Sequence, residues 1–173
     1  MTQILFSFNR VKAIEAILYI SSHISDPTKH SISKLLYFAD KTSMERYGRF
    51  ISGDTYFAME YGPVPSATYD LLKNPQLSRI IEFQVIDDKK IIPLREPNLN
   101  ELSDSDIEAM DTIIDIYGNV PFWKRTQDSH DDAWKEAWDK RGDAQSEMMS
   151  VESIIKLLED GDELLEHIRM YHE

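Results

Sequence analysis

Three side chains of this 173-residue chain are of types that could do acid–base or metal chemistry: Asp40, Asp54 and His130. Two carboxylates and an imidazole can supply a general base or bind a divalent metal. Asp40 is the most unusual by position, because it lies on the same helical face as Leu36 and Met44. A carboxylate within an apolar stripe must be paired or hydrogen-bonded.

The alternative for Asp40 is a structural role, and this is the interpretation that we favour. Its carboxylate would tie the turn 48–54 to the helix, through backbone N–H groups or through an arginine. Structural ion networks perturb carboxylates just as functional sites do. The position of Asp40 therefore indicates a buried, satisfied carboxylate before it indicates a catalytic one.

Nothing else in the sequence completes a catalytic or ligand-binding motif. Zinc needs three or four ligands, and the other histidines have no spacing that would assemble them around His130. Ser129 is only adjacent to His130, which does not establish a triad, and there is no glycine-rich phosphate loop. The chain has no cysteine, so thiolate sites are excluded. We therefore predict no catalytic residue, no metal, no cofactor and no enzymatic activity.

Helices are the main elements that must position these residues, according to apolar spacing and capping signals. The helix that carries Asp40 should end at Gly48 in the left-handed conformation. Ser103 and Asp106 stand in capping-box spacing, and Gly161 is either a close-packing point or a break in the last helix. The predicted helices are 10–22 after the cap Asn9, one capped by Ser31 or Ser33, 66–73, one from Ser103 to Gly118, 121–127, one capped by Asp131 or Asp132, and one capped by Ser150 that runs through Ile168.

Three short segments have the composition or the alternation of strands. They are 55–61, 80–86 and 91–92. Pro63 and Pro65 lack N–H donors, so the first strand is expected to stop before them. The predicted fold class is α+β, mainly α-helical: a compact helical domain with a small antiparallel β-sheet of about three strands, in a single domain over residues 1–173.

The overall composition is ordinary for a soluble globular protein, with 42% hydrophobic residues. No apolar run approaches the roughly 18 residues that a membrane-spanning helix needs. The N-terminus shows no basic-then-apolar signal pattern. We therefore expect a cytoplasmic protein without a membrane partner.

Charge is distributed unevenly along the chain, whose net charge is −12. Residues 1–95 carry 12 basic and 10 acidic side chains, whereas residues 96–173 carry 7 basic and 21 acidic side chains. An acidic half argues against direct nucleic-acid binding, which needs a basic face. The acidic charge suggests either a basic protein partner that is attracted electrostatically or simply a well-solvated surface.

Aromatic residues in the second half could serve the core or an interface. Trp134 and Trp138 are four residues apart, so they should stack on one side of a short helix. We expect Trp134 to be buried and at least one of Trp123 and Trp138 to reach the surface. Trp123 and Trp138 are therefore candidate partner-binding residues.

A second set of candidate partner-binding residues lies in the glycine-rich and proline-rich stretch of the first half. Arg46, Arg49, Tyr56 and Tyr61 are placed around a loop that glycines and prolines should stiffen. A pre-shaped loop lowers the cost of ordering on binding. Our hypothesis is that these four residues face a partner-binding groove, while packing of the turn is their default role.

The ordered set of motifs in this chain resembles the Panacea domain of the SocA-like antitoxin family, formerly a domain of unknown function. The resemblance covers nearly the whole chain, although Phe50 stands where a smaller residue is expected. The motifs are Tyr37-Phe38-Ala39-Asp40-Lys41, Tyr47-Gly48-Arg49, Gly53-Asp54, Gly62-Pro63-Val64-Pro65-Ser66, Tyr69-Asp70, Leu102-Ser103-Asp104, Tyr117-Gly118, Ser129-His130 and Trp134. The structural signature within them consists of Tyr37, Asp40, Gly48, Gly53, Asp54, Gly62, Pro63, Pro65, His130 and Trp134.

This resemblance implies the antitoxin of a bacterial, phage-associated toxin–antitoxin system. Such an antitoxin neutralises a cognate protein toxin, encoded next to it, by direct protein–protein contact, and the toxin is often one that stops translation. Two alternatives remain: a proteolytic adaptor that presents a toxin to a protease, and a metal-dependent hydrolase built on Asp40, Asp54 and His130. The toxin, the contact surface and the oligomeric state are left open by the sequence.

Overall fold

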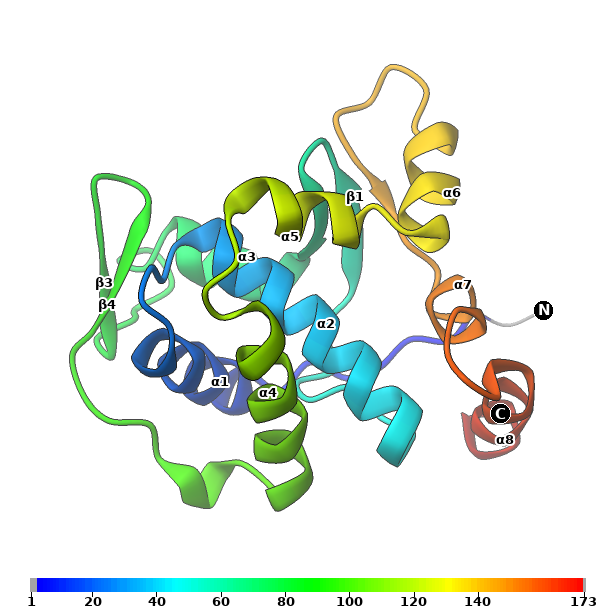
Figure 1. The fold of residues 1–173 in the computed structure, drawn as a ribbon, viewed down its shortest axis with the longest axis horizontal. Coiled ribbons are helices and arrows are strands. Elements are labelled where there is room, and N and C mark those ends of the chain that lie inside the picture. The colour runs from blue at the N-terminus through cyan, green and yellow to red at the C-terminus, as the bar shows by residue number, and fades with distance from the viewer. Residues whose placement is uncertain (1–2, 173) are drawn as a thin grey trace.

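The computed structural model describes residues 3–172; Met1, Thr2 and Glu173, which belong to the predicted domain 1–173, lie outside the described residues. Helices dominate and the strands are short and antiparallel, so the predicted α+β, mainly helical class is confirmed. Helix α2 (Lys29–Tyr47) crosses the centre of Figure 1, with the other elements arranged around it. Among the described helices, none combines the length and the apolarity that a membrane span requires.

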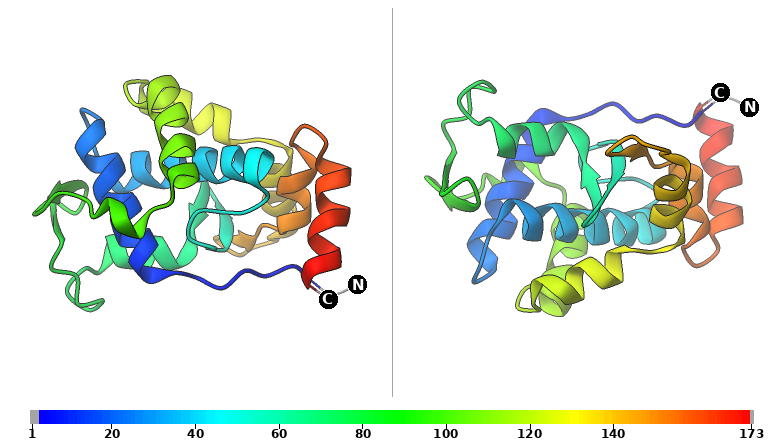
Figure 2. Two further views of the ribbon diagram at one scale, coloured as in Figure 1. Left: turned by 90° about the horizontal axis from the view of Figure 1, so that it is seen from below. Right: turned by 90° about the horizontal axis from the view of Figure 1, so that it is seen from above.

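The other elements follow in chain order. The helices are α1 (Arg10–His23), α3 (Ser66–Lys73), the 3-10 turn η1 (Leu99–Glu101), α4 (Asp104–Tyr117), α5 (Phe122–Ser129), α6 (Asp132–Lys140), α7 (Val151–Lys156) and α8 (Gly161–His172). The strands are β1 (Tyr56–Met59), β2 (Gly62–Pro65), β3 (Phe83–Ile86), β4 (Lys90–Pro93) and β5 (Glu147–Met148). The segment before α1 runs along the molecule towards α7 and α8 (Figure 2), where the N–H of Ile4 donates to Glu152.

Helix α2 starts earlier than the sequence analysis expected. Thr28 is its N-cap: the Thr28 hydroxyl accepts from the N–H of Ser31, and the Ser31 hydroxyl accepts from the N–H of Thr28. The prediction of Ser31 or Ser33 as the cap is therefore wrong, because Ser31 is the third helical residue of a capping box. Gly48 ends the helix with φ 73°, and its predicted left-handed role is confirmed.

Strand β1 lies at the centre of a three-stranded antiparallel sheet in the order β2–β1–β5. The predicted size of the sheet is right, but its predicted partners are wrong. Residues 62–65 form β2, and residues 147–148 form β5, where no strand was expected. Segments 83–86 and 90–93 instead form a separate hairpin, seen at the left of Figure 1.

Strand β2 accommodates two prolines because it is the edge of the sheet. Pro63 and Pro65 have no N–H group, so Gly62 and Val64 make the backbone hydrogen bonds to β1. Alternate residues of a strand direct their backbone groups to opposite sides. The carbonyl of Pro63 therefore points outwards from the sheet. The first strand does stop before the prolines, at Met59, but the prolines themselves belong to a second strand at the edge of the sheet.

Local capping signals in the second half are confirmed. Ser103 and Asp106 form a capping box at the start of α4. Asp131 caps α6 by accepting from the N–H of Trp134. The rings of Trp134 and Trp138 stack with centroids 5.3 Å apart, as their spacing predicted.

The predicted last helix is two helices, α7 and α8, with a break between Lys156 and Gly161. Asp160 adopts φ 55° in this break, and Gly161 begins α8. A Cβ on Gly161 would lie 2.3 Å from the carbonyl oxygen of Ile155, so the turn needs glycine there. Of the two roles left open for Gly161, the break is the one observed.

Gly62 is a glycine whose replacement should damage the fold. It has φ 115°, and an added Cβ would lie 2.4 Å from Ser129 Oγ and 2.8 Å from Lys34 Cε. Gly62→Ala should therefore lower the free energy of unfolding by about 2–4 kcal/mol, which combines backbone strain with overpacking. Gly142→Ala is the matched control, because Gly142 has φ 61° but nothing within 4 Å. Equal losses in urea unfolding of the two variants would contradict this account.

Candidate functional site

Asp40 ties the loop after α2 back onto the helix. Its carboxylate accepts from the N–H of Ile51 at 2.7 Å and from the hydroxyl of Tyr56 at 2.6 Å. The side chain is buried in the core. Burial raises the pKa of the Asp40 carboxyl to about 7, although the hydrogen bonds from Tyr56 and Ile51 act in the opposite direction. This geometry is that of the structural interpretation of Asp40.

The other two residues of the hydrolase alternative are also engaged elsewhere. Asp54 accepts from the N–H groups of Ala67 at 3.0 Å and Thr68 at 2.8 Å, and so caps α3, whose own N-cap is a proline. His130 stacks on Trp134 with centroids 3.7 Å apart. Within residues 3–172, no group of three or more histidines, aspartates and glutamates is arranged to hold a metal ion.

The turn between β1 and β2 is fixed by side chains from three helices. Lys34 of α2 donates from Nζ to the carbonyl of Pro63 at 2.8 Å. Trp134 of α6 donates from Nε1 to the carbonyl of Met59 at 2.8 Å. Gly62 lies against Ser129 at the end of α5. The hairpin is thereby locked against α2, and it forms one wall of a groove.

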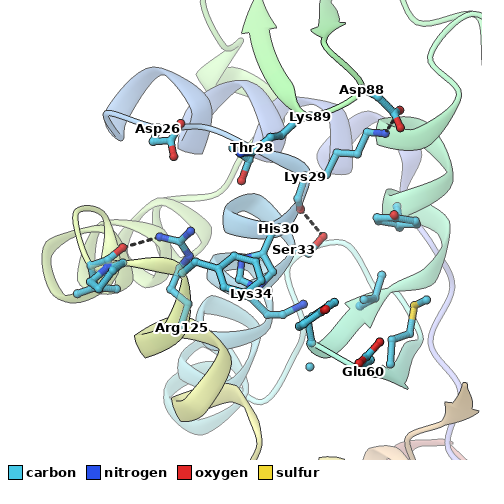
Figure 3. Close-up of a pocket in the computed structure, with 18 of the residues that line it drawn as sticks. Asp26, Thr28, Lys29, His30, Ser33, Lys34, Glu60, Asp88, Lys89 and Arg125 are labelled. Atoms are coloured by element: carbon cyan, nitrogen blue, oxygen red, sulfur yellow. Dashed lines mark hydrogen bonds and ion pairs between the residues drawn. The ribbon is translucent and has the colours of Figure 1, made fainter.

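This hairpin groove, of about 1130 Å³, lies between α2, the β1–β2 turn and the start of α5 (Figure 3). Its volume is slightly above the range of roughly 300–1,000 Å³ that is usual for sites of drug-sized ligands. It is lined by Ser25, Asp26, Thr28, Lys29, His30, Ser33, Lys34, Met59, Glu60, Tyr61, Gly62, Val64, Tyr69, Asp88, Lys89, Gly118, Asn119, Val120, Pro121, Phe122, Arg125, Trp138, Arg141, Ala144 and Gln145.

Two buried cations lie in the lining of the hairpin groove. Lys34 is 2% exposed and Arg125 is 7% exposed. Burial, followed by the charge of Arg125, lowers the pKa of Lys34 to about 7. Burial, followed by the charges of Lys34 and Arg125, lowers the pKa of His30 to about 3. At neutral pH His30 is therefore uncharged, while Arg125 keeps a fixed positive charge.

Exposed aromatic rings lie in and next to the groove: Tyr61 and Phe122 line it, and Trp123 follows Phe122 in α5. Tyr61 is 55% exposed, Phe122 is 47% exposed and Trp123 is 64% exposed. Tyr61 packs edge-on to Phe122 at 5.6 Å, and Phe122 stacks on His30 at 3.8 Å. We refer to Tyr61, Phe122 and Trp123 as the aromatic rim. Trp138 also lines the groove, with Cζ of Arg141 3.4 Å from the centroid of its ring.

The candidate partner-binding residues fall in three different places. Tyr61, Trp123 and Trp138 lie in or beside the hairpin groove. Arg46 and Arg49 are at the far end of α2, where Arg46 pairs with Glu108 and Arg49 donates to hydroxyl groups at the start of α4. Twelve residues of helix separate Lys34 from Arg46, which is about 18 Å. The candidate partner-binding residues therefore do not form one continuous surface.

Tyr56 is not at the surface at all. It is 2% exposed, and its hydroxyl is held by the carboxylate of Asp40. Its ring packs edge-on to the rings of Tyr37 and Phe50. Of the two roles considered for Tyr56, the contacts are those of turn packing. Phe50, the departure from the expected motif, is itself a core residue at 6% exposure.

Lys34 and Arg125 were missed by the sequence analysis. The available signal for Lys34 was the one that singled out Asp40: a charged residue among apolar neighbours on a helix buried on several sides. Arg125 gave no such signal, because its helix is short and polar on most positions. Its burial follows from how α5 packs beside α2.

Comparisons with known proteins identify one similarity. A family model described as antitoxin SocA-like, Panacea domain, matches residues 32–135. The matched segment begins in α2 and ends in α6, so it includes Lys34, Arg125 and the aromatic rim, whereas His30 and Trp138 of the groove lie outside it. No curated protein and no solved structure gave a significant match.

Removal of the Asp40 carboxylate should destabilise the protein. Asp40→Ala leaves the N–H of Ile51 and the hydroxyl of Tyr56 without an acceptor in the core, at a cost of roughly 1–3 kcal/mol in the free energy of unfolding. Thermal and urea unfolding measure this loss, with Asp139→Ala on α6 as a control. An unchanged midpoint together with lost function would instead identify Asp40 as a functional residue.

Lys34 should give the protein a distinctive dependence on pH. Its pKa is about 7 in the folded protein, against an ordinary value of 10.5, so the unfolded chain binds more protons between these values. The free energy of unfolding should therefore rise with pH from 7 towards 9, by roughly 1–2 kcal/mol relative to Lys34→Met. His30 and His130, whose pKa values are lowered, do not titrate in this window. Parallel pH profiles for the two proteins in urea unfolding would refute the assignment.

Proposed function

We propose a neutralising function for this protein, which belongs to the SocA-like antitoxin family and carries its Panacea domain. In this proposal the protein binds a cognate protein toxin directly and blocks its action without chemistry of its own. The toxin is encoded beside it and stops translation, as the resemblance of the motifs implies. Family membership supports the antitoxin role, and the remaining features of the proposal are ours.

The observation that carries the proposed contact surface is the aromatic rim. Large aromatic side chains are the commonest anchors of protein interfaces. Tyr61 and Trp123 are more than half exposed although they adjoin well-packed elements. The hairpin that presents Tyr61 is already fixed by Lys34 and Trp134. A partner would therefore meet an ordered surface, which keeps the entropic cost of binding low.

Electrostatics favour a basic toxin. The chain has a net charge of −12, and all of its acidic excess lies in residues 96–173. Long-range attraction between unlike charges speeds encounter and is screened by salt. We therefore expect the association rate to fall as ionic strength rises, with a smaller change in the dissociation rate.

Substitution of the rim should weaken toxin binding. In surface kinetics with the product of the adjacent gene, Tyr61→Ala and Trp123→Ala should each weaken binding by roughly 30-fold, mainly through faster dissociation, as expected for anchor residues worth about 2 kcal/mol. Tyr171→Ala is the matched control, because Tyr171 is an aromatic residue of α8 that is 73% exposed. Arg49→Ala should have little effect, since Arg49 contacts α4.

Two outcomes would overturn this assignment. Wild-type binding and growth rescue by both rim variants would show that the contact surface lies elsewhere. Absence of any complex would remove the mechanism of direct neutralisation. A third measurement, the lifetime of the toxin in cells, separates neutralisation from a proteolytic adaptor: a neutralised toxin persists, whereas a toxin presented to a protease disappears.

A further inference from the structure

The two buried cations of the hairpin groove, Lys34 and Arg125, have no carboxylate within ion-pair distance among the described residues. Burial lowers the pKa of Arg125, although the charge of Asp26 acts to raise it. Lys34 has one acceptor, the carbonyl of Pro63. Arg125 donates from Nη1 to the carbonyl of Val120 at 2.5 Å, while its Nε is buried without an acceptor. Several donors of these two side chains are therefore free for another acceptor.

The surrounding charge makes this arrangement more unusual. The lining of the groove holds five lysines and arginines against three carboxylates, in a chain whose net charge is −12. Elsewhere in the core, two buried carboxylates have a cationic partner: Glu15 pairs with Arg95, and Asp106 with Lys12. A buried charge without a counter-charge is costly, and proteins normally avoid it. The groove is an exception, because its buried positive charges are not in ion pairs with any described residue.

The groove also offers planar stacking surfaces beside these cations. Figure 3 shows Lys34, from α2, and Arg125, from α5, among the lining residues with His30. Phe122 stacks on His30 and remains 47% exposed, so its outer face is accessible. Buried cations and exposed aromatic rings in one groove are together complementary to a ligand with an anionic end and a planar ring.

We propose that the hairpin groove binds a nucleoside phosphate, with phosphate oxygens on Lys34 and Arg125 and the base against the aromatic rim. A guanidinium and an ammonium are the usual protein donors to phosphate. A volume of about 1130 Å³ leaves room for a ligand larger than a single anion. A multiply charged phosphate matches two unpaired cations better than one carboxylate does. The antitoxin would bind this ligand by itself, without the toxin being present.

The test is calorimetric titration of the full chain with ADP, pyrophosphate and glutarate at one ionic strength. ADP should bind saturably at one site per chain, and pyrophosphate more weakly because it has no ring. Arg125→Gln should weaken both by about tenfold or more, the usual effect of losing a charged hydrogen bond. Phe122→Leu should weaken ADP binding and leave pyrophosphate binding unchanged. Arg46→Gln, at the far end of α2, is the matched control and should change neither.

Three results would overturn the proposal. They are the absence of saturable ADP binding, equal losses in Arg125→Gln and Arg46→Gln, and binding of glutarate as tight as that of ADP. The last result would favour a carboxylate, such as an acidic side chain of a protein partner. Lys34→Met is a second variant for the anion site, and its thermal unfolding must first show that it is folded. Because no toxin is present, failure here leaves the neutralising function untouched.

Discussion

The buried polar side chains of α2 are the constraint on which the rest of the fold depends. Lys34 holds the carbonyl of Pro63, Tyr37 donates to Asp131, Asp40 accepts from two groups of the following loop, and Ser43 donates to the carbonyl of Arg49. A buried polar group that loses its partner costs roughly 1–3 kcal/mol. Each of these side chains therefore fixes one segment of chain against the helix, which apolar packing alone would not specify.

This arrangement determines where a partner can be met. With the β1–β2 turn fixed by Lys34 and Trp134, Tyr61 is carried outwards on a rigid hairpin, beside the first residues of α5. The other end of α2 is occupied differently, because Arg46 and Arg49 are engaged by α4. The two ends of α2 therefore differ. At one end the arginines are paired with α4, whereas the other end lies beside exposed aromatic rings and beside cations without an ion-pair partner among the described residues.

Features that depend on three or four neighbouring residues could be predicted from the sequence. Gly48 ends α2, Ser103 and Asp106 cap α4, and Trp134 stacks on Trp138, because the relevant atoms belong to one turn of chain. The partners of a strand are set by residues far away. Strand β5, at 147–148, is too short to give a pattern, so its pairing with β1 could not be read from the sequence.

The candidate site shows the same division between local and distant information. Asp40 and Lys34 carry the same signal, a charge within a helix that is buried on several sides. Asp40 meets a backbone N–H and a hydroxyl from the loop that follows, which satisfies its carboxylate. Lys34 meets a single carbonyl and, across the groove, the like charge of Arg125. The sequence can therefore locate buried charges, whereas only the groups that face each charge distinguish a structural tie from an open binding site.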